Sequence, residues 1–345
     1  MKEMLTYKDE INQILNPFIS FEHADVDVLK DKRVLITGAT GLIGTYIVEC
    51  FRELINTYKI NVKVTCICHS KLLKDEPNIH YVKVDITQPI VLGAFDYIIH
   101  AASNTHPKQY AGDPIGTITT NVFGTKNLLD LAALNPKSRF ILCSSVEVYG
   151  KSIEGQDEFT ETSSGYIDCN TLRANYPESK RLSETLCNAY REVNGQDFVI
   201  ARLTRCYGST IKKDDTKVLS QFINNALEGK DIVLKSKGEQ EFSYVYVADA
   251  VSAIFTLLFY GESGNAYNIS DNNSNIKLKD LAKYIASKSH TNVVFDLPDD
   301  VESKGFSTAD MTKLNTDKIE ALGWKAKTDI KEGILRVLTR MQLES

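Results

Sequence analysis

The chain has 345 residues, of which 43% are hydrophobic, and it carries a formal net charge of −5 at pH 7. The apolar share is ordinary for a globular protein and is enough for a sizeable core, and this length favours two closely joined lobes. Acidic and basic residues are interspersed, which excludes the strongly basic surface of a nucleic-acid-binding protein.

Neither membrane insertion nor a metal site is expected. The N-terminal MKEMLTYKDEINQILNPF lacks the apolar region of a signal peptide, and no apolar run approaches a membrane span. Seven scattered cysteines without a C-x-x-C pair are typical of free thiols in a reducing cytoplasm. No His/Cys/Asp/Glu cluster has metal-ligand spacing. We therefore expect a cytoplasmic protein without a membrane or metal partner.

Strand and helix patterns alternate along the chain after an amphipathic N-terminal segment. Apolar residues recur at helical spacing in residues 1–20, which we expect to pack on the body of the protein rather than bind a partner. Expected strands then lie at 33–37, 62–68, 81–84, 95–100, 140–144 and 198–203, and expected helices at 42–55, 117–134 and 176–193. After about residue 205 the rhythm loosens, with helices near 217–229, 278–289 and 329–341. Short apolar strands separated by amphipathic helices predict a parallel sheet covered on both faces.

The segment TGATGLIG (37–44) places three glycines between the first strand and the first helix. Gly38 permits a tight turn, Gly41 lets backbone amides approach a pyrophosphate, and Gly44 allows close packing of helix on strand. The helix N-terminus also attracts phosphates. A glycine triplet alone is a weak signal, but its position in the first strand–helix unit predicts a dinucleotide-binding site.

The end of the second strand leaves the choice between NAD and NADP open. It reads CICHSK, with neither an acidic residue for a ribose 2′-hydroxyl nor an arginine for a 2′-phosphate. His69 lies at this strand end. Asp85, which ends the segment VKVD, is either an adenine contact or an ordinary strand-terminal carboxylate.

Tyr176 and Lys180 form a Y-x-x-x-K pair near the start of a helix, so both side chains lie on one face. Tyrosine is a weak base at neutral pH, but a neighbouring ammonium and a positive nicotinamide ring favour its phenolate. Ser145 follows an apolar strand, and Glu147 stands two residues later in SSVEVYG (144–150). A surface pair would also explain the Tyr and Lys, but with the glycine motif and Ser145 they predict a catalytic site.

These motifs resemble the extended short-chain dehydrogenase/reductase family, whose members modify sugar nucleotides. The resemblance covers roughly residues 33–325 and includes IIHAAS (98–103), NVFGTKNLL (121–129), YVYVADAV (244–251), AYNIS (266–270) and LGW (322–324). It implies Tyr176 as the base, Lys180 as the group that lowers the pKa of the tyrosine and binds ribose, and Ser145 as the partner of the sugar hydroxyl. The implied cofactor-binding residues are Gly38, Thr40, Gly41, Leu42, Ile43, Gly44, His69, Asp85, Ile86, Ala101, Ala102, Ser103, Asn121, Tyr176 and Lys180.

Within this family the pattern looks most like UDP-glucuronate decarboxylases. The likeness runs through residues 100–125, 172–190 and 214–234. It implies a nucleotide-diphosphate sugar as substrate, with contacts from Ser103, Tyr110 and Arg173.

The chemistry that this likeness implies is redox-neutral. Tyr176 takes the proton of the C4 hydroxyl while hydride passes to NAD, which gives a 4-keto sugar. The ketone makes the C5 substituent labile, so a carboxylate is lost as CO2 or a C5 proton is removed, and hydride then returns. Alternatives are a C4 or C5 epimerase, a 4,6-dehydratase, a net NAD(P)-dependent 4-oxidase or reductase, and a non-catalytic nucleotide-sugar sensor.

One departure from the family pattern bears on the reaction. Dehydratases typically carry Thr-Asp-Glu where this chain has Ser145, Val146 and Glu147. There the Asp protonates the departing C6 hydroxyl and the Glu removes the C5 proton. Val146 cannot donate a proton, which disfavours a dehydratase, although decarboxylases usually have a small polar residue there. We expect Glu147 to act at C5 rather than to be a solvated loop residue.

A second departure concerns a cation. Relatives commonly place an arginine, thought to bind the diphosphate, where Phe242 stands, and an asparagine where Arg205 stands. Because a guanidinium can bind phosphate through two parallel hydrogen bonds, we expect Arg205 to take over the diphosphate contact. An unrelated surface arginine is the alternative.

We predict an α/β fold, a Rossmann-like doubly wound parallel sheet with a smaller mixed α/β C-terminal substrate lobe. The expected parts are a helical extension (1–32), an NAD(P)-binding domain (33–204, with a returning segment near 236–262) and a sugar-nucleotide-binding lobe (205–345). Helices 117–134 and 176–193 typically pair across a homodimer interface in this family, although internal packing would leave a similar pattern.

A few polar residues are given structural roles. His100 is expected to pack at a strand end, and Glu241 and Asp249 to serve surface and capping roles. His106 and His100 are both expected near the nicotinamide side of the site.

Overall fold

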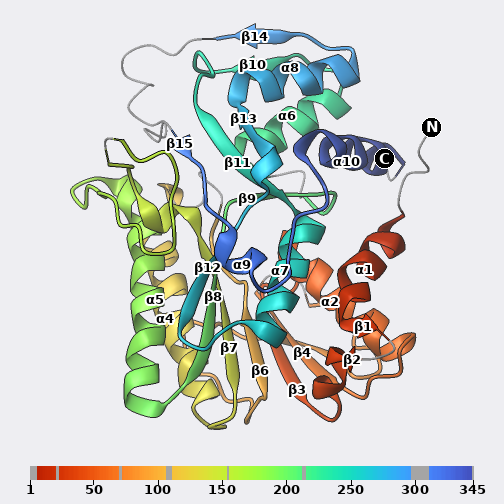
Figure 1. Ribbon diagram of the computed structural model, residues 1–345, viewed down its shortest axis with the longest axis vertical. Helices are drawn as coiled ribbons and strands as arrows, with labels where there is room; N and C mark the ends of the chain where they lie inside the picture. The colour runs from red at the N-terminus through yellow and green to blue at the C-terminus, as the bar shows by residue number, and fades with distance from the viewer. Residues whose placement is uncertain are drawn as a thin grey trace.

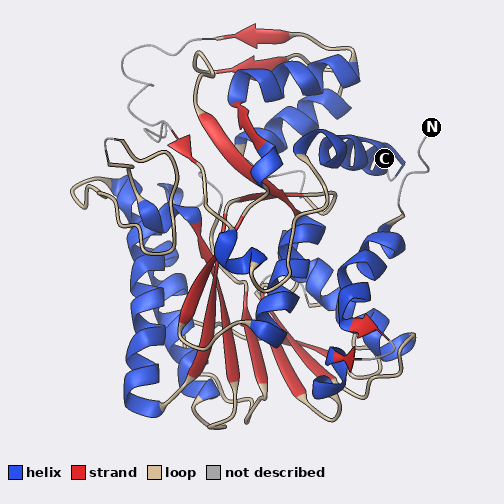
Figure 2. Ribbon diagram, viewed as in Figure 1, coloured by secondary structure: helices blue, strands red, loops and turns tan. Residues whose placement is uncertain are grey.

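A parallel sheet forms the lower half of the molecule in the computed structural model, which describes residues 6–20, 23–69, 72–105, 111–153, 155–211, 215–296 and 311–343 (Figures 1 and 2). Within these residues the sheet has seven strands, and all neighbouring pairs are parallel. The first of them in the chain, β3, lies inside the sheet, and the later strands are added first on one side of it and then on the other. Ligands of such sheets bind beyond the carboxyl ends of the strands at this change of direction. In spatial order the strands are β12 (Asn265–Ile269), β8 (Asp197–Leu203), β7 (Arg139–Ser145), β6 (Tyr97–His100), β3 (Arg33–Thr37), β4 (Lys63–Cys68) and β5 (Ile79–Lys83).

Helices cover both faces of the sheet. α4 (Pro114–Ala132) and α5 (Asn175–Asn194) lie side by side on one face, while α2 (Leu42–Asn56) and α7 (Val247–Tyr260) cover the other (Figure 1). The central strand β3 shows why both faces need cover. Its Val34 and Ile36 belong to one buried cluster and Leu35 to the other, because successive strand side chains point to opposite faces.

A smaller lobe stands above the carboxyl ends of the strands. Its central strand β11 (Glu241–Tyr246) pairs with β9, β13 and β15, and a separate pair joins β10 to β14. Helices α6, α8 and α10 pack together beside these strands (Figure 1). The bounds are β9 (Arg205–Tyr207), β10 (Ile232–Leu234), β13 (Asn275–Lys277), β14 (Val293–Phe295), β15 (Met311–Thr312), α6 (Val218–Leu227), α8 (Leu278–Ser289) and α10 (Ile330–Leu343). The short helix α9 (Asp317–Glu320) contacts β12 of the large sheet instead.

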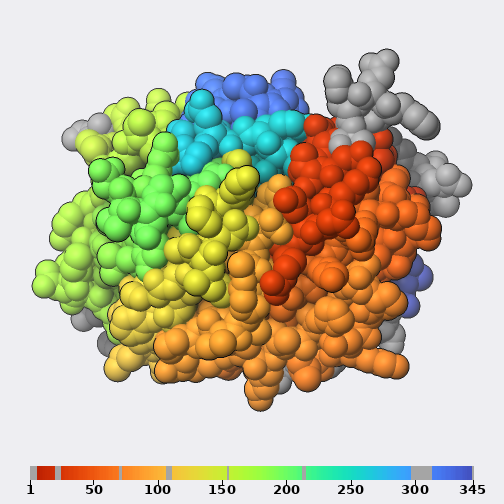
Figure 3. All heavy atoms as spheres, turned by 90° about the horizontal axis from the view of Figure 1, so that it is seen from below, coloured from red at the N-terminus to blue at the C-terminus, as the bar shows by residue number. Residues whose placement is uncertain are grey.

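The N-terminal segment packs on the sheet-bearing lobe, as the amphipathic pattern predicted. Helix α1 (Tyr7–Leu15) contacts α2 and α7 and buries Ile11, Ile14 and Leu15. A capping box between Thr6 and Asp9 begins the helix. Two short antiparallel strands, β1 (Ile19–Ser20) and β2 (His23–Ala24), follow it. Seen from below, this red segment lies against the orange residues that follow it in the chain (Figure 3).

The predicted fold class is confirmed, and most element boundaries shift by a few residues. The helix expected at 117–134 starts earlier, at Pro114, because Asp113 caps it and proline fits the first helical position. β12 was anticipated only as a motif and proves to be the edge strand beside β8. The domain boundaries given above remain a prediction. No helix in the described part of the chain is long and apolar enough to cross a membrane.

Candidate functional site

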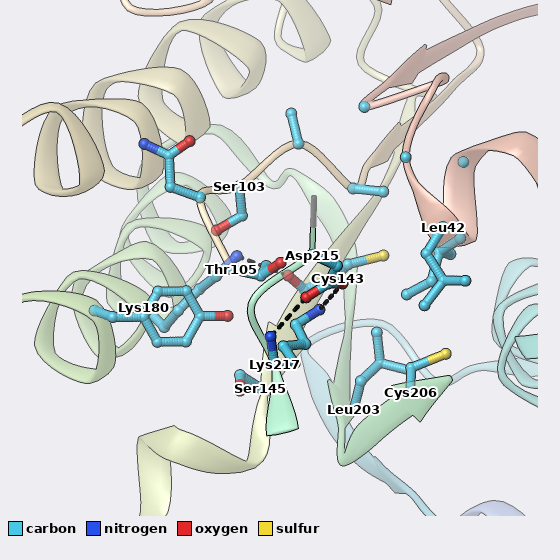
Figure 4. A pocket seen from close by; sticks show the side chains of 18 of the residues that line it. Leu42, Ser103, Thr105, Cys143, Ser145, Lys180, Leu203, Cys206, Asp215 and Lys217 are labelled. Carbon is cyan, nitrogen blue, oxygen red and sulfur yellow. Dashed lines mark hydrogen bonds and ion pairs between the residues drawn. The ribbon is translucent and has the colours of Figure 1, made fainter. Parts of the chain in front are cut away.

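A cavity of about 740 Å³ lies where the two lobes meet, at the carboxyl ends of the parallel strands. The turn between β3 and α2, the ends of β4, β6 and β7, and the start of α5 line it from the large lobe. β9, the start of α6, and β11 line it from the smaller lobe. In the close view, Ser103 and Lys180 lie at one side and Leu42 at the other (Figure 4). A pocket between lobes at the strand-order reversal is the default ligand site of this architecture.

The glycine turn brings backbone rather than side chains to the cavity. Gly38 has φ +70°, and a Cβ there would lie 2.8 Å from the carbonyl of Ala101. A Cβ on Gly44 would lie 2.0 Å from the carbonyl oxygen of Gly38, so helix and turn could not pack this closely around any other residue. Gly41 is the N-cap of α2 and leaves its first amides accessible. This turn is a cradle for an anionic group.

The other predicted cofactor residues line the same cavity, with one exception. Asp85 lines the cavity, and its carboxylate accepts hydrogen bonds from the backbone and side chain of Thr87, which lower its pKa. Asn121 lies behind the wall instead: it is buried, accepts from Ser103 Oγ at 2.7 Å and donates to Ser179 Oγ at 2.9 Å. The remaining lining residues of this predicted set are Gly38, Thr40, Gly41, Leu42, Ile43, Gly44, His69, Ile86, Ala101, Ala102, Ser103, Tyr176 and Lys180.

Tyr176 and Lys180 lie in the first turns of α5 and are both buried in the wall of the cavity. Lys180 Nζ donates a hydrogen bond to the carbonyl oxygen of Cys143, at 2.9 Å. Burial lowers the pKa of Lys180 to about 8, and the carboxylate of Glu184 opposes this shift. Ser145 ends β7 beside them, and its Oγ accepts a hydrogen bond from the amide of Glu147 at 3.3 Å. The structure therefore brings the predicted catalytic residues to one wall.

Glu147 and Arg173, which the sequence analysis assigned separately, form an ion pair. Glu147 lies in a short 3₁₀ helix after β7, Arg173 lies in another just before α5, and Oε2 and Nη2 are 3.0 Å apart. Both side chains line the cavity, as does Val146. Arg181 Nε donates to the carbonyl oxygen of Val148 at 2.7 Å and fixes the same 3₁₀ helix. A carboxylate beside a guanidinium thus faces the cavity next to Ser145.

Arg205 and Phe242 lie on the neighbouring parallel strands β9 and β11. The Arg205 guanidinium carbon is 3.8 Å from the centre of the Phe242 ring, and both residues line the cavity. Stacking on an aromatic face orients a guanidinium without neutralising it. Arg205 therefore brings a positive charge to the smaller-lobe wall.

The sequence analysis missed a second charged pair in the cavity. Lys217, just before α6, donates its amide proton to Asp215 Oδ1 at 2.8 Å, and its Nζ lies 3.9 Å from Asp215 Oδ2. The segment DDTK that carries both residues was noted only as a likeness, because no periodic pattern indicates which side chains of a loop face a cavity. Figure 4 shows both in the middle of the view.

The remaining predictions have mixed outcomes. His100 is buried, its Nδ1 lies 2.8 Å from Thr37 Oγ1, and burial lowers its pKa to about 3, in keeping with a packing role. Asp249 is buried rather than at the surface; it accepts hydrogen bonds from the amides of Lys327 and Thr328, and burial raises its pKa to about 6. His106 and Tyr110 lie outside the described residues.

Comparison with known proteins agrees with this architecture. Residues 34–270 match the NAD dependent epimerase/dehydratase family. UDP-glucuronic acid decarboxylase 5 of Arabidopsis thaliana is 31% identical over 308 residues, which are 88% of this chain and 87% of the plant protein. The dTDP-glucose 4,6-dehydratase of Streptomyces venezuelae, solved with bound NAD, has TM-score 0.77 at 24% identity and covers 91% of this chain and 97% of its own. The UDP-glucose 4-epimerase of Thermotoga maritima, solved with UDP-glucose, has TM-score 0.75 at 20% identity, covering 90% and 98%.

The chain belongs to the NAD dependent epimerase/dehydratase family. The predicted resemblance to extended short-chain dehydrogenases/reductases is confirmed at the level of the family. The two solved structures support the fold alone, because each is under 25% identical to this chain.

Proposed function

We propose that this protein is an NAD-dependent enzyme that converts a nucleotide-linked sugar through a transient 4-keto intermediate, with UDP-glucuronate decarboxylation as its reaction. The observation that carries the proposal is the shared cavity: Ser145, Tyr176 and Lys180 line the same cavity as the glycine turn. The 31% identity to a UDP-glucuronic acid decarboxylase over most of both chains supports the choice of reaction.

The glycine turn fits a dinucleotide. Any Cβ at Gly38 or Gly44 would meet backbone atoms, so the turn requires glycine at both positions, and a glycine turn at a helix N-terminus lets backbone amides approach a pyrophosphate. When bound, NAD would accept hydride from C4 and return it later. His69 and Asp85 would lie toward the adenosine end. The segment CICHSK at the end of β4 has neither an acidic residue nor an arginine, so identification of the cofactor released on denaturing the protein would test NAD against NADP.

Three residues would carry the proton chemistry at C4. Ser145 would hold the C4 hydroxyl, and Tyr176 would accept its proton. The Lys180 ammonium, in the first turns of the same helix, would stabilise the negative charge on the tyrosine oxygen. Because these groups sit in a buried wall, their electrostatic effects are stronger than in water.

Glu147 would act at C5 of the sugar. Loss of CO2 from a 4-keto uronate leaves an electron pair that the ketone takes up as an enolate, and C5 must then gain a proton. Glu147 and Arg173 form a charged pair at the cavity wall beside Ser145, which supports a role for Glu147 in delivering that proton. Val146, which lines the same wall, has no proton to give to a departing C6 hydroxyl, and this disfavours dehydration.

The experiment is incubation of the purified protein with UDP-glucuronate, UDP-glucose and dTDP-glucose, followed by mass spectrometry of the products. Loss of carbon dioxide from UDP-glucuronate is expected. Loss of water would indicate a dehydratase, loss of hydrogen a net oxidase, and an unchanged mass with an altered NMR spectrum an epimerase. Turnover of none of these substrates would overturn the decarboxylase proposal.

We propose that Arg205, whose guanidinium is stacked on the ring of Phe242, binds the diphosphate of the sugar nucleotide. Replacing Arg205 with alanine is expected to weaken binding of UDP by roughly 10- to 100-fold, since charge-assisted hydrogen bonds to phosphate contribute about 1.5–3 kcal/mol each. Isothermal titration with UDP and with uridine separates the cases. Uridine affinity should hardly change, and unaltered UDP affinity would contradict the assignment.

We further propose a homodimer built from α4 and α5 of two copies. Ile118, Phe123 and Leu182 on these adjacent helices are 42%, 51% and 46% exposed. Exposed apolar side chains gathered on two neighbouring helices indicate an interaction surface. The change Phe123→Lys is expected to shift the protein from dimer to monomer in sedimentation velocity, and a native protein that sediments as a monomer would rule the dimer out.

We also propose that the protein resides in the cytoplasm. Its seven cysteines are free and mostly buried, which suits a reducing compartment. Recovery of the protein in a membrane or secreted fraction after cell fractionation would contradict this assignment.

A further inference from the structure

A buried carboxylate outside the catalytic cavity ties together the two ends of the described chain. Glu10, on the N-terminal helix α1, has no solvent exposure. It accepts hydrogen bonds from Tyr46 Oη at 2.7 Å, Tyr246 Oη at 2.8 Å and Arg340 Nη1 at 3.0 Å. Its second cation, Arg336, lies 3.6 Å away. The mechanism proposed above uses none of these groups.

Arg340 extends the network from Glu10 into the loop after β9. Its Nη1 also donates to Ser209 Oγ at 2.7 Å and to Tyr46 Oη at 3.1 Å. Figure 1 shows α1 and α10 on the same side of the molecule. We call this cluster the N-terminal clasp; it consists of Glu10, Tyr46, Ser209, Tyr246, Arg336 and Arg340.

The clasp holds three segments that wall the cavity. Tyr46 lies in the first turns of α2, directly after the glycine turn. Ser209 is followed by Thr210, which lines the cavity and donates to the carbonyl oxygen of Leu42 at 3.1 Å. Tyr246 ends β11, whose Tyr244 lines the cavity as well. A single side chain from α1 thus fixes the phosphate cradle of one lobe to the strands of the other.

The clasp depends on Glu10 more than on any of its partners. Arg340 lies 3.0 Å from Glu10, and Arg336 lies 3.6 Å from Glu10 and 2.6 Å from Glu332, so removing the Glu10 carboxylate leaves buried positive charge that Glu332 compensates only in part, which is destabilising locally. Glu10, Arg336 and Arg340 all lie outside residues 34–270, the part that matches the family. The charged groups of the clasp therefore lie outside the matched region, which contains its hydroxyl partners Tyr46, Ser209 and Tyr246.

We propose that α1 acts as a clasp that keeps the two lobes closed around the cavity and so slows dissociation of the bound dinucleotide, with Glu10 as a positioning residue. This rests on the proposed function, in which the hydride returned to the sugar comes from the same cofactor molecule that took it up. A cofactor that left between the two hydride transfers would strand the 4-keto intermediate. Slow dissociation is then a requirement of the reaction, and α1 meets it.

The test is the dissociation rate of NADH from the full chain, followed by fluorescence after dilution into excess NAD. The change Glu10→Gln keeps the shape of the side chain and removes its charge. We expect NADH to leave about tenfold faster, because the lobes open more often when Arg340 and Arg336 lose the charge of the Glu10 carboxylate that they share. Hydrogen exchange should quicken in residues 205–211 and 241–246 and stay unchanged in β3 and β6.

Asp9→Asn is the matched control. It lies next to Glu10 on the same helix but is exposed and serves only the capping box, so its NADH dissociation rate should stay within about twofold of wild type. If Glu10→Gln does not fold, Ser209→Ala removes only the contacts of the Ser209 hydroxyl with Arg340 and Tyr46 and should quicken dissociation about threefold.

Two results would overturn the clasp. One is an NADH dissociation rate in Glu10→Gln, or in Ser209→Ala where it stands in, equal to that of wild type. The other is faster hydrogen exchange throughout the chain, which would mean a purely structural loss. Wild-type protein that binds no NADH would instead refute the proposed function, and the clasp with it.

Discussion

Replacing Tyr176 with phenylalanine is expected to lower turnover of the sugar nucleotide about 10³-fold, the scale that a positioned general base contributes. The ring keeps its place because Tyr176 is buried in the wall of the cavity, so only the hydroxyl is lost. Without a base the C4 hydroxyl cannot lose its proton as hydride leaves. NADH affinity should stay within about twofold, since the phenylalanine ring still fills the wall.

The measurement is the steady-state rate at pH 7, where Lys180, whose pKa is about 8, keeps most of its charge. Tyr190→Phe is the matched control, because Tyr190 lies on the same helix α5 and its hydroxyl bonds to Asp130 instead. We expect that variant to turn over at close to the wild-type rate. A Tyr176→Phe enzyme with more than about a tenth of wild-type activity would show that Tyr176 is not the general base.

The parts of the site that the sequence predicts are those set by short spacings. The glycine turn and the Tyr176–Lys180 pair depend on a few consecutive residues at a strand–helix junction or on one turn of a helix, so their geometry follows from local structure. The alternation of apolar strands and amphipathic helices likewise predicts a doubly wound sheet, because each strand must be covered on both faces.

Contacts between distant segments could not be predicted in the same way. Glu147 and Arg173 were each singled out, but nothing in the sequence indicates that two 3₁₀ helices bring their charges within 3.0 Å. Glu10 meets Arg340 from the opposite end of the chain, and a buried glutamate in an amphipathic helix looks like any exposed one until its partners are placed. Asn121 shows the reverse case: a motif position near the cofactor site that acts from behind the wall.

Glu147→Gln is expected to lower product formation from UDP-glucuronate about 100-fold, within the range for loss of a proton-transferring group. The amide keeps the volume of the carboxylate but cannot exchange a proton at C5. Oxidation at C4 should persist, because Ser145, Tyr176 and Lys180 are untouched. The enzyme should therefore accumulate NADH absorbance with the 4-keto sugar, which stopped-flow spectroscopy at the NADH band would record.

The ion pair with Arg173 has to be separated from the proton chemistry of Glu147. The side chain of Glu147 is 29% exposed and that of Arg173 is 37% exposed, so loss of the ion pair alone should cost at most about 1 kcal/mol of stability. Arg173→Lys keeps a cation beside Glu147 and should retain turnover within about tenfold, whereas Glu147→Gln should not.

Wild-type turnover in Glu147→Gln would mean that Glu147 is a solvated loop residue without a catalytic role, and the proton at C5 would then have to come from water. A slow Glu147→Gln enzyme that builds up no NADH would place Glu147 at the first hydride transfer instead, because only a block after C4 oxidation leaves the cofactor reduced.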